Sequence, residues 1–134
     1  MADERTFVML KPDCIKRGLI GEVIRRIERK GYRILDVKMR NLTHEFLEEH
    51  YAHIADKPFF PDVARYMMSG PVFGMAVSGE NVVLGVRILV GATKFEEAGG
   101  GTIRGDYAES TSSNLIHASD SPENGEIEIK RFFK

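Results

Sequence analysis

The hydrophobic periodicity of this chain changes at Gly31 from that of a helix to that of a strand. In segment 20–27, apolar residues recur at the i, i+3, i+4 and i+7 spacing that places them on one face of a helix. In segment 33–40, apolar and polar residues alternate, as they do in a half-exposed antiparallel strand. The chain is therefore expected to combine helices with an antiparallel sheet.

Shorter patterns predict the remaining elements. Strand-like runs lie at 6–10, 72–77 and 114–117, and the run 72–77 is apolar on both faces, as a central strand would be. Further helices are expected to begin at Thr43, near Pro61, after Asn81 and at Ser121-Pro122, the last with Ile127, Ile129 and Phe132 or Phe133 inward. We predict an α+β fold: a ferredoxin-like split βαβ sandwich with a four-stranded antiparallel sheet and helices packed on one face.

The composition restricts where the protein acts and what it binds. A length of 134 residues with 43% hydrophobic residues suits a single domain, residues 1–134. A net charge of −1 provides no general attraction for nucleic acid or an anionic membrane, and no apolar run approaches the roughly 20 residues of a membrane span. The lone Cys14 and an N-terminus without a secretory pattern favour the cytoplasm.

Three basic residues stand in positions where a phosphate could bind. Lys11 follows the strand 6–10, Arg87 lies in an apolar helix, and Arg104 lies in the glycine-rich segment 91–114, which shows no strong period. The apolar neighbours of Arg87 predict a partly buried guanidinium that needs an anionic partner. The glycine-rich run lacks the Gly-Lys-Ser/Thr ending of a P-loop, so by itself it is a weak phosphate motif.

His117 ends an apolar run, and the small and hydroxyl residues after it would leave its imidazole accessible. Glu128, further along on the last helix, could reach back and fix the tautomer of this ring. From the residues alone, a structural histidine and a surface glutamate remain the more common outcomes. Ser119 invites a hydrolase interpretation, but no Gly-x-Ser-x-Gly motif accompanies it.

Two further groups have a functional and a structural interpretation. His50 and His53 have a spacing found in metal sites, but no third ligand lies near them in the sequence. Tyr51, Phe59 and Val63 could clamp a nucleobase or could belong to the core. The residue types alone favour the structural interpretation of both groups.

Taken together, four strings resemble the signature of the nucleoside diphosphate kinase family in order and spacing. They are Lys11-Pro12-Asp13, Lys57-Pro58-Phe59-Phe60, Gly101-Thr102-Ile103-Arg104-Gly105-Asp106 and Asn114-Leu115-Ile116-His117-Ala118-Ser119-Asp120-Ser121. The resemblance covers nearly the whole chain. It implies ping-pong transfer of the γ-phosphate from a nucleoside triphosphate to a diphosphate through a phosphohistidine at His117.

The resemblance also implies roles for the other site residues. Around the phosphates and ribose it places Lys11, Arg87, Thr93, Arg104 and Asn114. It implies that Phe59 and Val63 hold the base, that Tyr51 and Ser119 lie near the histidine and the transferring phosphate, and that Glu128 accepts a hydrogen bond from the imidazole. Mg²⁺ would arrive with the nucleotide rather than on protein ligands.

The resemblance further implies a homo-oligomer, with a hexamer favoured over a tetramer or dimer. Departures from the family pattern occur at Gly100, Lys94-Phe95, Ser112-Ser113 and Ala118. None of them removes a catalytic group, but those in the long loop affect a region that builds subunit contacts in hexameric relatives. A nucleotide-binding module without turnover is therefore the alternative, whereas a nucleoside monophosphate kinase is disfavoured because the P-loop is absent.

Overall fold

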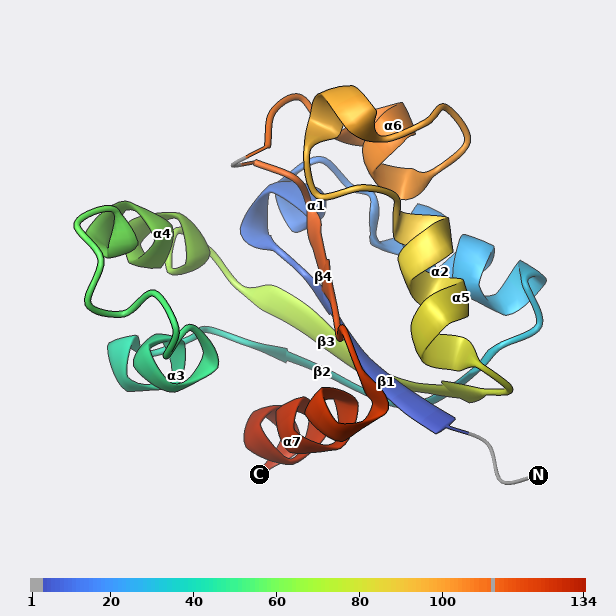
Figure 1. The fold of residues 1–134 in the computed structure, drawn as a ribbon, viewed down its shortest axis with the longest axis horizontal. Helices are drawn as coiled ribbons and strands as arrows, with labels where there is room; N and C mark the ends of the chain where they lie inside the picture. Colours follow the sequence, from blue (N-terminus) through green and yellow to red (C-terminus); the bar gives the residue numbers. More distant parts are fainter. Residues whose placement is uncertain (1–3, 112) are drawn as a thin grey trace.

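The computed structural model describes residues 4–111 and 113–134, so Met1–Asp3 of the N-terminus and Ser112 of the loop lie outside the described part. Its centre is a four-stranded antiparallel sheet in the order β2-β3-β1-β4 (Figure 1). The strands are β1 (Glu4–Leu10), β2 (Arg33–Arg40), β3 (Val72–Gly79) and β4 (Ile116–Ala118). This architecture confirms the predicted α+β, ferredoxin-like sheet.

The two central strands, β1 and β3, pair over seven residues, from Glu4 opposite Gly79 to Leu10 opposite Phe73. Both are apolar on their two faces, which is what a strand buried on both sides requires. The edge strand β2 differs, since Leu35, Val37 and Met39 are each 45–49% exposed. The sheet therefore has a well-buried centre and one edge with an exposed apolar face.

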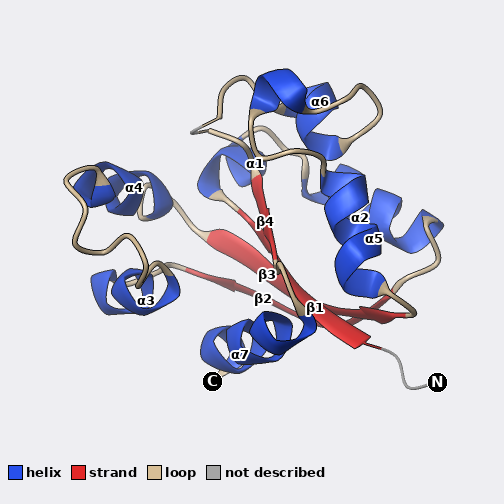
Figure 2. Ribbon diagram, in the orientation of Figure 1, coloured by secondary structure: helices blue, strands red, loops and turns tan. Residues whose placement is uncertain are grey.

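Seven α-helices and one short 3-10 helix are found in the described residues (Figure 2). They are α1 (Pro12–Lys16), α2 (Ile20–Arg29), α3 (His44–His50), α4 (Phe60–Met67), α5 (Val82–Val90), η1 (Phe95–Glu97), α6 (Ile103–Tyr107) and α7 (Pro122–Phe133). Predicted caps are present, because Thr43 accepts a hydrogen bond from the Phe46 N–H and Ser121 accepts one from the Asn124 N–H. No helix among these residues is long and apolar enough to cross a membrane.

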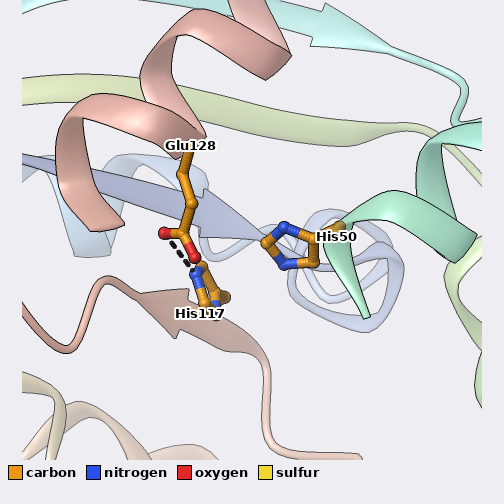
Figure 3. A group of neighbouring side chains, drawn as sticks. All are labelled: His50, His117 and Glu128. Atoms are coloured by element: carbon orange, nitrogen blue, oxygen red, sulfur yellow. Dashed lines mark hydrogen bonds and ion pairs between the residues drawn. The ribbon is translucent and has the colours of Figure 1, made fainter. Parts of the chain in front are cut away.

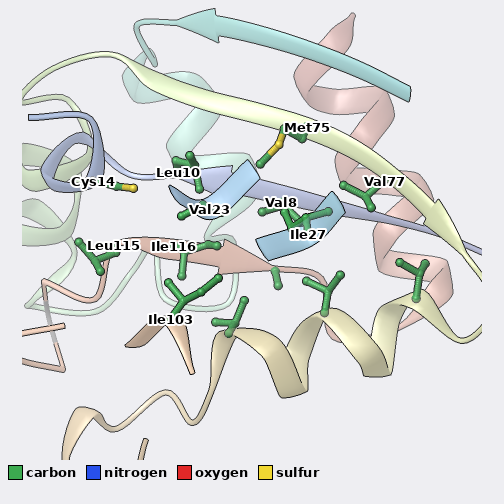
Figure 4. Close-up of a cluster of buried hydrophobic side chains, with 14 residues drawn as sticks. Val8, Leu10, Cys14, Val23, Ile27, Met75, Val77, Ile103, Leu115 and Ile116 are labelled. Carbon is green, nitrogen blue, oxygen red and sulfur yellow. The ribbon is translucent and has the colours of Figure 1, made fainter. Parts of the chain in front are cut away.

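Helices cover both faces of the sheet, so the prediction of helices on one face was wrong (Figure 1). Val8 and Leu10 of β1 face a core built with α2 and α5 (Figure 4), whereas Phe7 and Met9 face one built with α3, α4 and α7. The physical reason is the apolar character of both faces of β1 and β3. Each face loses favourable burial unless helices cover it.

Other differences concern short elements and one orientation. The sequence predicted only a turn after Lys11 and only a loop at 91–114, yet α1, η1 and α6 lie there. Helices of three to five residues are too short to show a period. In α7, Ile129 and Phe132 are buried as expected, but Ile127 is 51% exposed, because it lies on the opposite side of the helix from the core.

Candidate active site

A cavity of about 520 Å³ opens where β1 ends beside β4, between α5, α7 and the segment after α3. Most of the polar residues singled out in the sequence line its wall. From the predicted set these are Lys11, Tyr51, Arg87, Thr93, Arg104, Asn114, His117 and Glu128. Segments more than a hundred residues apart in the chain thus contribute to one site, because antiparallel pairing places β4 directly beside β1.

His117 lies in β4 opposite Met9, and its side chain points to the sheet face that α7 covers, with its ring centroid 6.1 Å from that of Phe7. Glu128 of α7 meets it there, and its Oε1 lies 2.9 Å from His117 Nε2 (Figure 3). A carboxylate only accepts, so Nε2 carries the ring proton and Nδ1 keeps its lone pair. No described residue hydrogen bonds to Nδ1.

Glycine lets α7 approach closely enough for this contact. A Cβ at Gly125 would lie 2.7 Å from the Arg5 carbonyl oxygen, and a Cβ at Gly74 of β3 would lie 2.3 Å from the Phe132 ring. Both distances are too short for a real carbon contact. The helix therefore rests directly on the sheet, and Glu128 reaches β4 from its first turns.

Ser119 completes the hydrogen bonding of this carboxylate. Its hydroxyl donates to Glu128 Oε1 at 2.7 Å and accepts from the Phe7 backbone N–H at 3.0 Å. The side chain is fully buried and does not line the cavity. Ser119 thus contacts Glu128 rather than the open side of the site.

The environment of Glu128 favours its charged form. Burial raises its pKa, but the hydrogen bond and charge interaction with His117 and the hydrogen bond from Ser119 oppose burial. Their combined effect exceeds that of burial, so the pKa of Glu128 lies below its usual range. The carboxylate is ionised at neutral pH and can hold the imidazole N–H.

On the other side of His117, three cations converge without a carboxylate partner. Arg104 is only 8% exposed, and its guanidinium donates to the Gly91 and Ile116 carbonyls at 3.1 and 2.7 Å. Arg87 donates to the Ala118 carbonyl at 3.3 Å, and Lys11 donates to Asn114 Oδ1 at 2.8 Å. No salt bridge among the described residues involves any of the three.

The lowered pKa values of Lys11 and Arg104 show that burial and neighbouring positive charge disfavour the charged forms of these side chains. Burial, assisted by the charge of Arg104, lowers the pKa of Lys11 to about 8. Burial, assisted by the charge of Arg87, lowers the pKa of Arg104 to about 10. Both groups would be stabilised in their charged forms by an anion in the cavity, and the forked guanidinium donors suit phosphate oxygens.

The burial expected for Arg87 was wrong, because the residue is exposed. The buried face of α5 consists of Val82, Val83, Val86 and Val90. One residue further along, the helix turns by about 100°, which carries Arg87 off that face and toward the cavity. A residue with apolar neighbours in sequence can therefore still lie on the open side of a helix.

The backbone before β4 is strained. Leu115 has a φ of 74°, in the left-handed region that a branched residue rarely occupies, and its side chain is fully buried. Its carbonyl accepts a hydrogen bond from the Lys11 N–H at 2.8 Å. This conformation ties the end of β1 to the start of β4, where Asn114 contacts the Lys11 ammonium.

Two predicted residues lie away from the others. Phe59 precedes α4 and is 51% exposed, Val63 lies within α4, and neither lines the cavity. Tyr51, which follows α3, does line it, and burial together with the charge of Glu128 raises the pKa of its hydroxyl to about 12.

His50 was not among the site residues predicted from the sequence. This residue ends α3, is 8% exposed, and lies edge-on to the His117 ring with centroids 4.8 Å apart. Its suggested metal partner His53 lies beyond the helix and is exposed. A signal existed in the spacing of His50 from the buried Phe46 and Leu47, which places it on the buried face of α3.

Comparison with known proteins finds one family over nearly the whole chain. The family profile described as nucleoside diphosphate kinase matches residues 4–134. A nucleoside diphosphate kinase of Acetivibrio thermocellus is 55% identical over 97% of this chain and 96% of the relative. One of Archaeoglobus fulgidus is 53% identical over 97% of this chain and 86% of the relative.

Solved structures are similar as well. A nucleoside diphosphate kinase of Halobacterium salinarum in complex with CDP superposes with a TM-score of 0.94 and 46% identity, over 99% of this chain and 89% of that chain. A structure from Encephalitozoon cuniculi gives a TM-score of 0.93 and 47% identity, over 96% of this chain and 88% of that chain. Sequence and backbone therefore agree over nearly the whole chain.

Proposed function

This chain belongs to the nucleoside diphosphate kinase family. We propose that the phosphate transferred between nucleotides passes through His117 in a ping-pong cycle. The chain is a nucleoside diphosphate kinase and binds nucleotides. The observation that carries the proposal is the free Nδ1 of His117. Glu128 occupies the other ring nitrogen, and Nδ1 is left unprotonated at the wall of a cavity lined by three cations without carboxylate partners.

In the first half-reaction, the lone pair of Nδ1 attacks the γ-phosphorus of a nucleoside triphosphate. The bond from this phosphorus to the bridging oxygen breaks, and the diphosphate leaves with that electron pair. In the second, a terminal phosphate oxygen of another diphosphate attacks the phosphorus, and the P–N electrons return to Nδ1. Glu128 supports both steps, because it stabilises the positive charge that the ring gains.

The three cations stabilise the negative charge of the transferred phosphoryl group and transfer no proton. As the phosphoryl group moves, charge spreads over its peripheral oxygens, and Lys11, Arg87 and Arg104 can stabilise it. Two of these groups are already held by backbone carbonyls, so little reorganisation is needed. Thr93 and Asn114 would contact phosphate and ribose, and Tyr51 would lie beside the transferring group.

We assign the base to Phe59 and Val63, although neither of them lines the cavity itself. An exposed aromatic ring can stack on any nucleobase without reading its edges. Broad tolerance toward the base follows from this mode of binding.

The donor set also bears on Mg²⁺. The cavity wall holds four lysine or arginine side chains and two carboxylates. Glu128 is engaged with His117 and Ser119, and Asp120 accepts a hydrogen bond from the Asn124 amide at 2.6 Å. Such a wall fits magnesium that is held by the nucleotide phosphates rather than by protein ligands. Bound in this way, the ion would neutralise part of the phosphate charge.

We also infer a single domain that assembles into a homo-oligomer, with a hexamer favoured, in the cytoplasm. One sheet carries both core clusters, which supports a single folding unit. The exposed apolar residues Leu35, Val37 and Met39 on the edge strand support assembly, because such an edge is normally covered. Light scattering on the purified protein measures the assembly state.

The decisive experiment is labelling with γ-labelled ATP and Mg²⁺, followed by a chase with GDP. Acid-labile label that forms on wild type, not on His117→Ala, and moves to GTP is the expected result. Label that forms but does not chase would indicate a regulatory phosphohistidine. Nucleotide binding without label would favour the binding-module alternative, and exchange by His117→Ala would place the chemistry elsewhere.

A further inference from the structure

His50 has a buried hydrogen-bond donor that nothing in the described structure accepts. Arg131 Nη1 lies 3.3 Å from His50 Nδ1, and since arginine only donates, Nδ1 accepts. The proton of a neutral ring therefore sits on Nε2, which is buried and has no partner. An unsatisfied buried N–H costs about 1–3 kcal/mol, so its retention calls for a reason.

The ring that carries this orphan donor belongs to a cluster that also holds an unused acceptor. One side-chain nitrogen or oxygen atom from each of His50, His117 and Glu128 lies within 4.8 Å of the other two (Figure 3). Oε1 of Glu128 accepts both from His117 and from Ser119, whereas no described residue donates to Oε2. Between side chains that lie this close, a small side-chain shift or a single bridging water can join a donor to an acceptor.

Other interpretations of this cluster are weaker. By distance alone it could hold a divalent cation, but a metal on Nε2 of His50 would move the ring proton to Nδ1, against the Arg131 donor. The cavity wall also carries Lys11, Arg87 and Arg104, which repel a cation. Burial, assisted by the charge of His117, lowers the pKa of His50 to about 3, so it is not a second charged group.

We infer that His50 is a positioning residue, whose Nε2–H holds the Glu128 carboxylate in the orientation that keeps the His117 proton on Nε2. Arg131 locks the tautomer of His50 and is itself held by Glu49, 3.2 Å from its Nε. A chain of side chains thus runs from Glu49 through Arg131 and His50 to the catalytic pair. This inference rests on the proposed role of His117.

The first test needs no variant. Nitrogen-15 NMR of histidine-labelled wild type at neutral pH should show a neutral His50 ring, with the proton on Nε2 and none on Nδ1. A proton on Nδ1 of His50, or a charged ring, overturns the inference. Because this measurement does not use activity, it remains decisive even if phosphate transfer does not pass through His117.

The second test compares His50→Gln, whose side-chain amide can donate from nearly the same place, with His50→Leu, which has no donor. His50→Leu should slow phosphorylation by ATP about tenfold in single turnovers, as loss of an orienting partner often does. Its KM for nucleotides should stay within about twofold, since its role is not in binding. His50→Gln should recover most of the rate, and the exposed His44→Gln is the matched control.

A structural role would give another pattern. If His50→Leu and His50→Gln lose the same activity in proportion to their loss of thermal stability, the inference fails. It also fails if His50→Leu keeps the wild-type rate and the His117 proton stays on Nε2. Mixed tautomers of His117 in His50→Leu, restored in His50→Gln, support it.

Discussion

The two sides of His117 are built on opposite principles. On the α7 side, Glu128 forms hydrogen bonds with the ring and with Ser119, and these bonds exist without any ligand. On the cavity side, Lys11, Arg87 and Arg104 share no carboxylate among the described residues. The contacts of the His117 ring with Glu128 are made in the free protein, whereas the three cations need an anion as their partner.

This difference separates the residues that stabilise the folded protein from those that serve binding and catalysis. Groups on the α7 side hold a tautomer, so they stabilise the fold and the nucleophile together. Groups on the cavity side repel one another until phosphate binds, so they serve binding and catalysis at some expense to the fold. Variants of the two sides should therefore differ in how activity and stability change together.

The largest effect is expected for Lys11→Met. Loss of this cation should lower kcat/KM by roughly 10²–10³-fold, the range found when one preorganised charge-stabilising group is removed. Thermal stability should not fall, because a depressed pKa means that the charged form is disfavoured in the free protein. Coupled-assay kinetics and calorimetry measure both. Lys16→Met, at an exposed position of α1, is the control, and a fall in Tm for Lys11→Met would contradict the comparison.

The same residue predicts a pH dependence. The pKa of Lys11 is about 8 in the free protein, below the usual lysine value. The unfolded chain therefore binds more protons between pH 8 and about 10, and this group makes stability rise with pH there. Activity should change in the opposite direction, with kcat/KM declining above about pH 8 as Lys11 loses its charge. A profile of Lys11→Met that keeps this decline would show that another group causes it.

A smaller loss of activity, accompanied by a loss of stability, is expected for Glu128→Gln. Phosphorylation should slow by about 10–100-fold, because the amide no longer stabilises the charged imidazole. The folded pKa of Glu128 is depressed, so its stabilisation is present above the unfolded pKa of about 4.3 and is lost as pH falls through the folded value. Urea unfolding at pH 7 and in acid should show the gap to wild type closing in acid.

The control for that experiment is Glu126→Gln on the same helix. Glu126 forms an ion pair with Arg5 near the surface and lies outside the cavity. Glu126→Gln should leave the rate of phosphorylation unchanged. It should change the free energy of unfolding only slightly, since exposed ion pairs contribute about 0–1 kcal/mol. Equal effects of the two substitutions on phosphorylation would show that Glu128 has no specific role in holding His117.

Ser119→Ala sharpens the comparison from within the α7 side. The change leaves the buried Phe7 N–H without its acceptor and takes one donor from Glu128. Unfolding should become easier by about 1–3 kcal/mol. The loss of activity should be smaller than for Glu128→Gln, because the contact between His117 and Glu128 remains. Denaturant titration and single-turnover kinetics give the two values, and a larger loss of activity than for Glu128→Gln would mean that Ser119 acts on the phosphate directly.

The smallest effect is expected for Phe59→Ala. This ring is 51% exposed, so its removal should change stability by no more than about 0.5 kcal/mol. If the ring stacks on the base, the KM for nucleotides should rise several-fold with kcat nearly unchanged, since stacking contributes about 1–3 kcal/mol per base. Met68→Ala, at the other end of α4, is the control. An unchanged KM would remove Phe59 from the base site.

Much of the fold could be predicted because its signals are local. Thr43 and Ser121 cap the helices that they were expected to cap, and the both-sided apolar run 72–77 lies in a central strand. A strand that is apolar on both faces indicates that helices cover both faces of the sheet. The prediction of helices on one face overlooked this. The helices α1 and α6 could not be predicted, because five residues carry too little periodic signal.

By itself, the sequence determined the longer helices and strands, the family and the chemical types at the site, since spacing and residue identity are local properties of the chain. Only the tertiary structure decided which groups meet. The bond between Glu128 and His117 depends on glycines that let α7 rest on the sheet, and the cluster of unpaired cations depends on β4 pairing beside β1. The position of His50 against the catalytic ring depends on where α3 packs, and no local pattern encodes that distance.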